Sequence, residues 1–246
     1  VTMADGTRLS RIAIIYGANA SGKSNLLAAF EYLFWFWKRR TDDQDAPTEV
    51  EPFALDSETP SQPTEFNLKL YVNNKKYIYQ LILNPKAVLS EKLYVYNSNQ
   101  PSLLLHRELV DGNTALKFNA TLIKVPAAVK EELTAKCLNN TSFFAARKGV
   151  NCNLGEIDDV RDWMINHTLP VIELGQHMFT YAESKMLDNP DAKNHLLVFS
   201  HQIGLNIEDM IVEKDYMSLT PEMIQFMQAT GRLSEENVSK LNKDPR

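Results

Sequence analysis

The fold is decided by the stretch Gly17-Ala18-Asn19-Ala20-Ser21-Gly22-Lys23-Ser24-Asn25. It fits the pattern G-x-x-x-x-G-K-[ST], in which a glycine-rich turn joins a buried strand to a helix and binds phosphate groups. An apolar run precedes the stretch at residues 12–16, and apolar residues recur at helical spacing from Leu26 onward. The pattern therefore stands in the context that makes it informative, and a chance match in an ordinary turn is the weaker alternative.

Each residue type in this loop has a physical reason. Gly17 and Gly22 let the backbone turn sharply, so that its N–H groups approach phosphate oxygens without an intervening Cβ. The positive end of the following helix also attracts anions. Lys23 is predicted to reach the β- and γ-phosphates as the catalytic cation, and the Ser24 hydroxyl is predicted to ligate Mg²⁺. All nine residues, 17–25, are therefore predicted to bind nucleotide.

Composition places the chain among globular proteins. It has 246 residues, 44% of them hydrophobic, which suffices for one large or two ordinary domains. The net charge of −5 argues weakly against a surface devoted to nucleic acid. Cys137 and Cys152 are too few for a disulfide framework or a zinc site, and no apolar stretch is long enough to span a membrane. We therefore expect a cytoplasmic protein without a membrane partner.

The elements around the loop follow from apolar spacing. Residues 10–16 are predicted to form a central parallel strand buried on both faces. The helix after Ser24 carries one broad apolar stripe that should pack on a sheet, although its further aromatic residues leave a subunit contact open. The basic triplet Lys38-Arg39-Arg40 should lie near the C-terminus of this helix, with contact to a phosphate backbone as the alternative. The acidic stretch 41–63 that follows should be an exposed connection.

An antiparallel meander of about fifty residues is predicted next. Apolar and polar residues alternate over residues 66–72 and 77–83, and Asn73-Asn74 between them suits a hairpin turn with positive φ. Further strands are predicted at 92–96, 103–110 and 115–118, with Asp111-Gly112 as a second turn.

Helices are predicted in the rest of the chain. One starts near Pro126 and ends at Asn139-Asn140, and a second covers residues 157–167. A third is framed by Asn189-Pro190 and Gly204, and a fourth opens at Thr220-Pro221.

The loop resembles the Gly-x-Asn-x-x-Gly-Lys-Ser-Asn form of ABC-type ATPases of the SMC, Rad50, RecF and OLD lineage. Within that lineage the chain looks most like the AAA15-type, RloA-like ATPases of prokaryotic defence against phage. The likeness extends to Pro52-Phe53-Ala54-Leu55, Tyr77-Ile78-Tyr79, Ser142-Phe143-Phe144-Ala145 and Gly204-Leu205-Asn206-Ile207-Glu208-Asp209. It implies a mixed α/β fold: the N-terminal lobe of an ABC-type P-loop NTPase with an antiparallel meander, followed by a helical segment.

The resemblance also implies ATP and Mg²⁺ as cofactors. It implies a homodimer closed through a composite ATP site and a partner effector resembling a nuclease, with nucleic acid as a further possible partner. Residues 1–125 would form the ATPase lobe, and residues 126–246 a mainly helical insertion or arm before the second half of the ATPase. Because the chain starts at Val1 and shows no Walker B strand or signature segment, we expect it to be the N-terminal part of a longer ATPase.

Residues beyond the loop are also candidates for functional roles. The family's γ-phosphate-sensing Gln would fall near residues 141–148, which contain none; Arg147 and Lys148 there would either contact phosphate or nucleic acid or belong to a solvated loop. His201 fits an ordinary helical residue better than a catalytic switch.

The leading hypothesis is an ATPase whose nucleotide-driven dimer closure controls an effector or nucleic-acid transaction in phage defence. The alternatives are a module that binds ATP without hydrolysing it and, less favoured, a small-molecule kinase.

Overall fold

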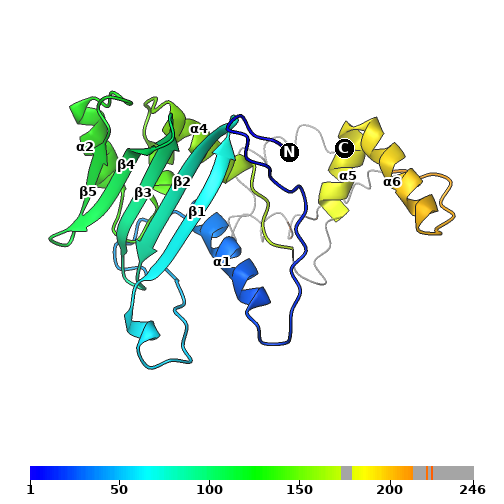
Figure 1. The fold of residues 1–246 in the computed structure, drawn as a ribbon, viewed down its shortest axis with the longest axis horizontal. Helices are drawn as coiled ribbons and strands as arrows, with labels where there is room; N and C mark the ends of the chain where they lie inside the picture. The colour runs from blue at the N-terminus through cyan, green and yellow to red at the C-terminus, as the bar shows by residue number, and fades with distance from the viewer. Residues whose placement is uncertain (173–178, 213–219, 221–222, 224–246) are drawn as a thin grey trace. The chain divides into compact units, whose positions relative to one another are not determined.

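The structure is a computed structural model that describes residues 1–172, 179–212, 220 and 223. The chain divides into two compact units, residues 1–172 and 173–246 (Figure 1). The predicted boundary after residue 125 falls inside the first unit. The helices of residues 127–166 pack on the sheet of this unit, so they share one core with it.

The first unit is built on a five-stranded antiparallel sheet with strand order β1-β2-β3-β4-β5. This confirms the predicted meander, and β3, β4 and β5 each start two to four residues earlier than predicted. Positive φ angles at Asn73 and Asn74 (50° and 64°) and at Asp111 and Gly112 (49° and 78°) confirm both tight turns. The strands are β1 Thr64–Val72, β2 Lys75–Leu83, β3 Val88–Tyr96, β4 Pro101–Val110 and β5 Asn113–Phe118.

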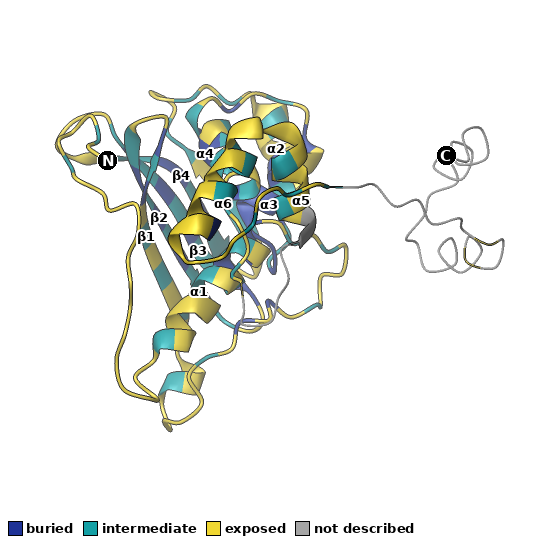
Figure 2. Ribbon diagram, turned by 90° about the vertical axis from the view of Figure 1, so that its right-hand side faces the viewer, coloured by how far each residue is buried: buried dark blue, intermediate teal, exposed yellow. Residues whose placement is uncertain are grey.

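The core lies on one face of this sheet. Alternate residues of each strand point inward and are buried, among them Tyr79 and Leu93, which lie opposite each other on β2 and β3. Trp37 packs edge-on against Tyr79 with ring centroids 5.5 Å apart, and Phe144 does so from another side at 5.8 Å. Figure 2 shows buried residues concentrated between the sheet and the helices of the first unit.

Helix α1, Lys23–Phe36, is anchored at only one end. Leu33, Phe36 and the C-cap residue Trp37 are buried in the core, whereas Leu26 and Leu27 near the N-terminus are exposed. The predicted apolar stripe therefore packs on the sheet only through its second half.

The basic triplet follows the end of α1, as predicted. Arg39 donates to the backbone O of Asn140 at 3.2 Å and lies 3.6 Å from the carboxylate of Glu49. The connection 41–63 is mostly exposed, as predicted, but Thr48 is fully buried and its hydroxyl donates to the backbone O of Asn84 at 2.7 Å. These contacts tie the connection to the sheet.

The prediction of a buried strand at residues 10–16 is wrong for this structure. The segment has no strand hydrogen bonds among the described residues, and Ile12 and Tyr16 are 80% and 89% exposed. A central parallel strand needs a neighbour at each edge and packed layers on both faces. The sheet of the first unit supplies neither, because its five strands are consecutive and antiparallel and do not include this segment.

Three helices complete the first unit. Helices α2, Ala127–Lys136, and α4, Glu156–Asn166, confirm two predictions. The short helix α3, Phe143–Ala146, was not predicted, because its buried Phe143 and Phe144 give too short an apolar run to show helical periodicity.

The second unit contains helices α5, Phe179–Asp188, and α6, Pro190–Gln202. Helix α5 was not predicted. Helix α6 was predicted together with its caps: the Asn189 side chain accepts from the backbone N–H of Asp191, and Gly204 has a φ of 82°. His201 is an exposed residue of α6. The helix predicted from Thr220-Pro221 lies outside the described residues, except for Thr220 and Met223.

Candidate nucleotide-binding loop

The loop of residues 17–22 turns tightly on the surface and leads directly into α1. Ala20 and Gly22 have positive φ angles of 63° and 88°, and Gly22 is the N-cap of the helix. The backbone N–H of Ser21 donates to the O of Ala18 at 3.3 Å and closes a turn. A Cβ at Gly17 would lie 3.0 Å from the Ser21 Oγ, so a larger residue there would require the Ser21 side chain to shift. Gly22, with its positive φ, serves the turn that the sequence predicted.

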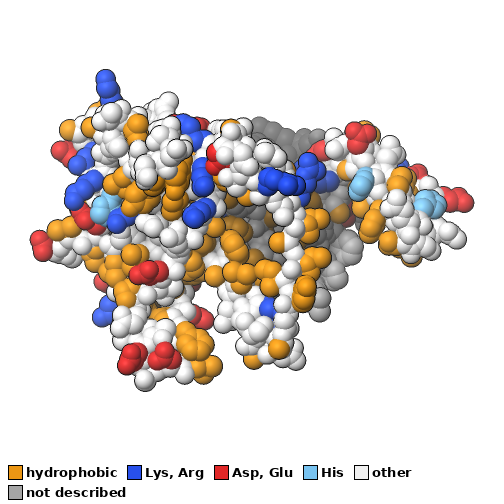
Figure 3. All heavy atoms as spheres, viewed as in Figure 1, with side chains coloured by type: hydrophobic (Ala, Val, Ile, Leu, Met, Phe, Trp, Pro, Cys, Tyr) orange, Lys and Arg blue, Asp and Glu red, His pale blue; other side chains and the backbone are white. Residues whose placement is uncertain are grey.

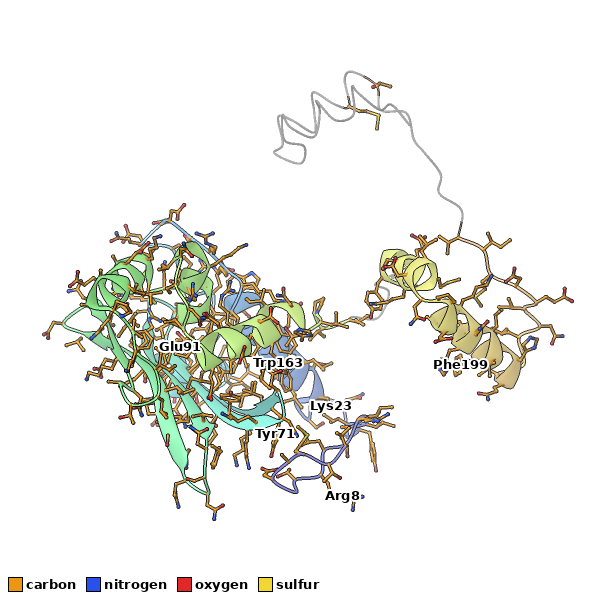
Figure 4. All side chains as sticks on the ribbon, turned by 90° about the horizontal axis from the view of Figure 1, so that it is seen from above. Arg8, Lys23, Tyr71, Glu91, Trp163 and Phe199 are labelled. Carbon is orange, nitrogen blue, oxygen red and sulfur yellow. The ribbon has the colours of Figure 1, made fainter. Side chains whose placement is uncertain are left out.

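Lys23 folds back over this turn. Its ammonium donates to the backbone O of Gly17 at 2.8 Å and of Ala18 at 2.6 Å, and lies 3.4 Å from the Ser21 Oγ. All three partners belong to the loop itself, so the ammonium is held at the turn without a carboxylate partner among the described residues. Figure 4 labels Lys23 at the exposed end of α1.

The N-terminus of α1 has unsatisfied donors. No side chain of residues 1–172 caps it, and the first backbone bond closes from Leu26 to the O of Gly22 at 3.1 Å. In the described part of the chain, the backbone N–H groups of Lys23, Ser24 and Asn25 have no acceptor. The free N–H groups at the start of a helix, with its positive dipole end, form an environment suited to anions.

These features fit the phosphate groups of a nucleotide. The residues bring together three free backbone donors, one ammonium and the exposed hydroxyl of Ser24, which makes no hydrogen bond in the described residues. Asn19 and Asn25 are exposed at the loop tip and in the first helical turn, as expected. The donor set suits a triphosphate, and the hydroxyl adds an oxygen ligand of the kind that Mg²⁺ accepts beside phosphate oxygens. The residues that the structure describes contain no cluster of three or more metal-ligating His, Cys, Asp or Glu side chains.

Arg147 neither lies in a solvated loop nor is free to contact phosphate or nucleic acid, the two roles that the sequence suggests for it. It is 8% exposed, its guanidinium donates to the Asp158 carboxylate at 2.9 Å, and it also donates to the backbone O of Val150 and of Cys152. These contacts fix the connection between α3 and α4. Lys148 beside it is exposed, so a basic pair near residue 147 does not form a phosphate site.

A buried polar cluster, which the sequence did not reveal, lies beside residues 141–148, where the resemblance places the γ-phosphate-sensing glutamine. Glu91 on β3 is fully buried and accepts hydrogen bonds from the Tyr79 hydroxyl at 2.9 Å, the Ser142 hydroxyl at 2.7 Å and the Phe143 backbone N–H at 2.8 Å. Arg107, opposite it on β4, lies 3.8 Å from its carboxylate. Burial, with the charge of Glu91 as a further cause, raises the pKa of Tyr79 well above its usual value, so the phenol remains a donor.

This cluster positions the segment after the meander. Arg107 also donates to the backbone O of Leu138 at 2.7 Å and of Asn139 at 3.1 Å, and Ser142 caps α3. Figure 4 places Glu91 away from Lys23, so the cluster is a structural anchor for residues 138–143 and does not contact the loop. The signal that would have revealed it is the inward register of Glu91, with buried Leu93 on its own strand and buried Leu81 opposite it on β2; this register becomes visible only when the strand pairing is known.

Comparison with known proteins adds one family. Residues 12–121, less than half of the chain, match the sequence model of a family described as AAA domain, putative AbiEii toxin, Type IV TA system. The matched part is a P-loop ATPase-like domain. The matched range contains both the loop and the whole meander, the two parts that the sequence predicted for the ATPase lobe. No curated protein and no solved structure matches the chain.

The family match supports nucleotide binding by an AAA-type ATPase domain. It is consistent with the mixed α/β fold, in which a five-stranded antiparallel sheet is combined with helices. In the described residues, no helix is both long and apolar enough to cross a membrane.

Proposed function

We propose that this chain is an ATP-binding subunit of the ABC-type ATPases, in which residues 17–25 hold the triphosphate of Mg²⁺-ATP. The observation that supports this most directly is the exposed N-terminus of α1, which has free donors at Lys23, Ser24 and Asn25 and the Lys23 ammonium beside them. The matched family supports the same class of ligand.

Each residue has a defined part in this proposal. The backbone N–H groups of residues 23–25 donate to phosphate oxygens, and Lys23 exchanges the carbonyls of Gly17 and Ala18 for the β- and γ-phosphates. The Ser24 hydroxyl ligates Mg²⁺. Bound Mg²⁺-ATP supplies the γ-phosphoryl group whose transfer to water is the ATPase reaction. The residues of this chain orient the triphosphate and stabilise its charge.

The wider role that we propose rests on the resemblance of the loop to ABC-type ATPases of the AAA15 type. In it, two copies close around ATP at a composite site, and closure controls a nuclease-like effector or a nucleic-acid transaction in cytoplasmic defence against phage. ATP would favour the closed state because it contacts both copies there, and such differential affinity is what a switch requires. The description of the matched family, a putative toxin of a type IV TA system, is compatible with such an effector role.

A second candidate is a module that holds ATP without hydrolysing it. For residues 1–246 it is supported by the sequence, in which no apolar segment ending in Asp-Glu follows the meander. The segment Leu169-Pro170-Val171-Ile172 has the apolar character but no strand structure.

Calorimetric titration of the protein with Mg²⁺-ATP tests the proposal, with Lys23→Ala as the variant and Lys38→Ala, exposed at the other end of α1, as the matched control. Removing one charge-assisted hydrogen bond should weaken binding by roughly ten- to hundredfold. Lys38→Ala should bind as the wild type does. Wild-type protein that shows no saturable binding, or a Lys23→Ala variant that binds as tightly as Lys38→Ala, would refute the proposed site.

Phosphate release by the same samples separates the two candidates. Turnover that Lys23→Ala abolishes supports the ATPase. Saturable ATP binding with no turnover supports the second candidate.

A further inference from the structure

The face of the sheet that points away from the core carries an unusual set of side chains. Strand register places residues of all five strands on it in transverse rows: Lys69, Ile78 and Tyr94 are cross-strand neighbours in one row, and Gln80, Lys92 and His106 in the next. We call this surface the open face, defined by its basic residues Lys69, Lys76, Lys92, His106 and Lys117 and its aromatic residues Tyr71, Tyr94 and Tyr96.

The helices of the first unit leave the open face accessible. They pack on the opposite, inner face, as the edge-on view of Figure 2 shows. Figure 3 looks onto the open face and shows Lys and Arg side chains interspersed with hydrophobic ones over the strands. Its tyrosines are half-buried, so their ring faces are partly accessible.

The charge of the open face is opposite in sign to that of the whole chain. The chain has a net charge of −5, but the strands of the open face carry four lysines and two carboxylates, Glu65 and Glu108. A third carboxylate, that of Asp5, lies 3.9 Å from the Lys76 ammonium. Lys117 engages Glu108 at 2.5 Å, and this hydrogen bond lowers the pKa of the Glu108 carboxyl. Lys69 and Lys92 have no acidic partner among the described residues. The excess positive charge is therefore available to an anionic partner.

A hollow at one edge of this face adds hydrogen-bonding groups. Its volume is about 760 Å³, within the usual size range of ligand pockets. Tyr71, Tyr96 and Asp5 form part of its wall, and the Tyr71 hydroxyl donates to the Asp5 carboxylate at 2.8 Å. The Lys76 ammonium lies 5.0 Å from the centre of the Tyr96 ring. The side chains of Asn97 and Asn99 line it without any hydrogen bond to the described residues. Amides both donate and accept, as the edges of nucleobases do.

We propose that the open face binds single-stranded nucleic acid. Lysines on neighbouring strands would contact the phosphates, and the partly accessible tyrosine rings, that of Tyr94 above all, would stack on unpaired bases. The amides of the hollow would pair with a base edge. Five strands spaced about 4.8 Å apart give a platform roughly 19 Å wide, enough for a short single-stranded segment. A duplex keeps its bases stacked on one another and would leave the tyrosines unused. The proposal is independent of the nucleotide-binding loop, because it uses none of its residues.

Fluorescence anisotropy of the full chain with labelled 20-mers of thymidylate and of uridylate tests the proposal. The variant combines Lys69→Gln with Lys92→Gln, and the matched control combines Lys86→Gln with Lys130→Gln, two exposed lysines outside the open face. Losing two phosphate contacts at a salt dependence of about −0.7 per contact should weaken binding on the order of 25-fold at about 0.1 M salt. The control pair should leave affinity unchanged. Tyr94→Leu, which keeps an apolar residue on the strand, should also weaken binding.

Three results would overturn the proposal. One is no binding of either oligonucleotide at protein concentrations up to about 100 µM. Another is equal affinity of the two double-lysine variants. The third is affinity for a duplex of the same length that matches the affinity for the single strand. A protein that binds ATP but neither oligonucleotide would refute this proposal alone, and one that binds oligonucleotide but not ATP would refute the nucleotide site alone.

Discussion

Replacing Glu91 by glutamine changes one oxygen of a fully buried carboxylate to an amide nitrogen. Its Oε1 accepts from Tyr79 and Ser142, whereas its Oε2 accepts from the backbone N–H of Phe143 and faces Arg107 at 3.8 Å. Glutamine can retain the first oxygen, but its NH₂ group then points toward a backbone donor and a guanidinium. The variant therefore loses one hydrogen bond to a charged acceptor and leaves the Arg107 charge without a counter-charge.

The size of the effect follows from these contacts. A hydrogen bond to a charged group contributes about 1.5–3 kcal/mol, and removing one partner of a buried pair costs about 3–5 kcal/mol. Arg107 is fully buried, and its Nε and Nη1 atoms have no hydrogen-bond partner among the described residues. Its Nη2 donates to backbone carbonyls, but Glu91 is its one carboxylate partner in the part of the chain that the structure describes. We expect Glu91→Gln to lower the free energy of unfolding of the first unit by about 3–5 kcal/mol.

Urea unfolding followed by tryptophan fluorescence measures this loss. Trp37 reports on the same core, because its ring packs 5.5 Å from that of Tyr79. Glu108→Gln is the control: it also removes a carboxylate from the sheet, but one that pairs with Lys117 on the opposite face. The control should unfold at nearly the wild-type urea concentration. If Glu91→Gln does so as well, the cluster is not the anchor that we describe.

Two further predictions concern the segment after the meander. Arg147→Met should lower the unfolding free energy by about 3 kcal/mol or more, because Asp158 and two backbone carbonyls lose a buried partner. The control Lys148→Met should leave the urea midpoint near the wild-type value. Equal midpoints of the two variants would contradict the structural role of Arg147. Burial raises the pKa of the Cys137 thiol to about 11, so at pH 8 Cys137 should react with a maleimide far more slowly than half-buried Cys152. Mass spectrometry of the Cys137→Ala and Cys152→Ala variants measures the two reaction rates. A faster reaction of Cys137 would contradict this prediction.

Local rules predicted the parts of the fold that depend on neighbouring residues. Asn73-Asn74 predicted its hairpin because two consecutive positive φ angles suit asparagine. Asn189 predicted the start of α6 through its side-chain cap, and Gly204 its end. Such signals need no knowledge of the remaining chain.

Features that depend on distant residues were not predicted. The apolar run at residues 12–16 has the composition of a buried strand, but burial requires partner strands, and the sheet of the first unit does not supply them. The sequence suggests only exposed roles for Arg147, because its partner Asp158 lies in another element. Glu91 and Arg107 are 16 positions apart, and only the pairing of β3 with β4 brings them together. The loop motif was found, in contrast, because all its residues are consecutive.

The uneven anchoring of α1 has a mechanical consequence. The C-terminal end of the helix is buried in the core at Phe36 and Trp37, whereas its first two turns, which include Lys23, extend from the core. A helix is stiff, so a small tilt of its packed C-terminal end at Phe36 and Trp37 produces a larger displacement of its N-terminal end. Motion of the sheet and motion of the glycine-rich turn are therefore linked through a single helix about 21 Å long.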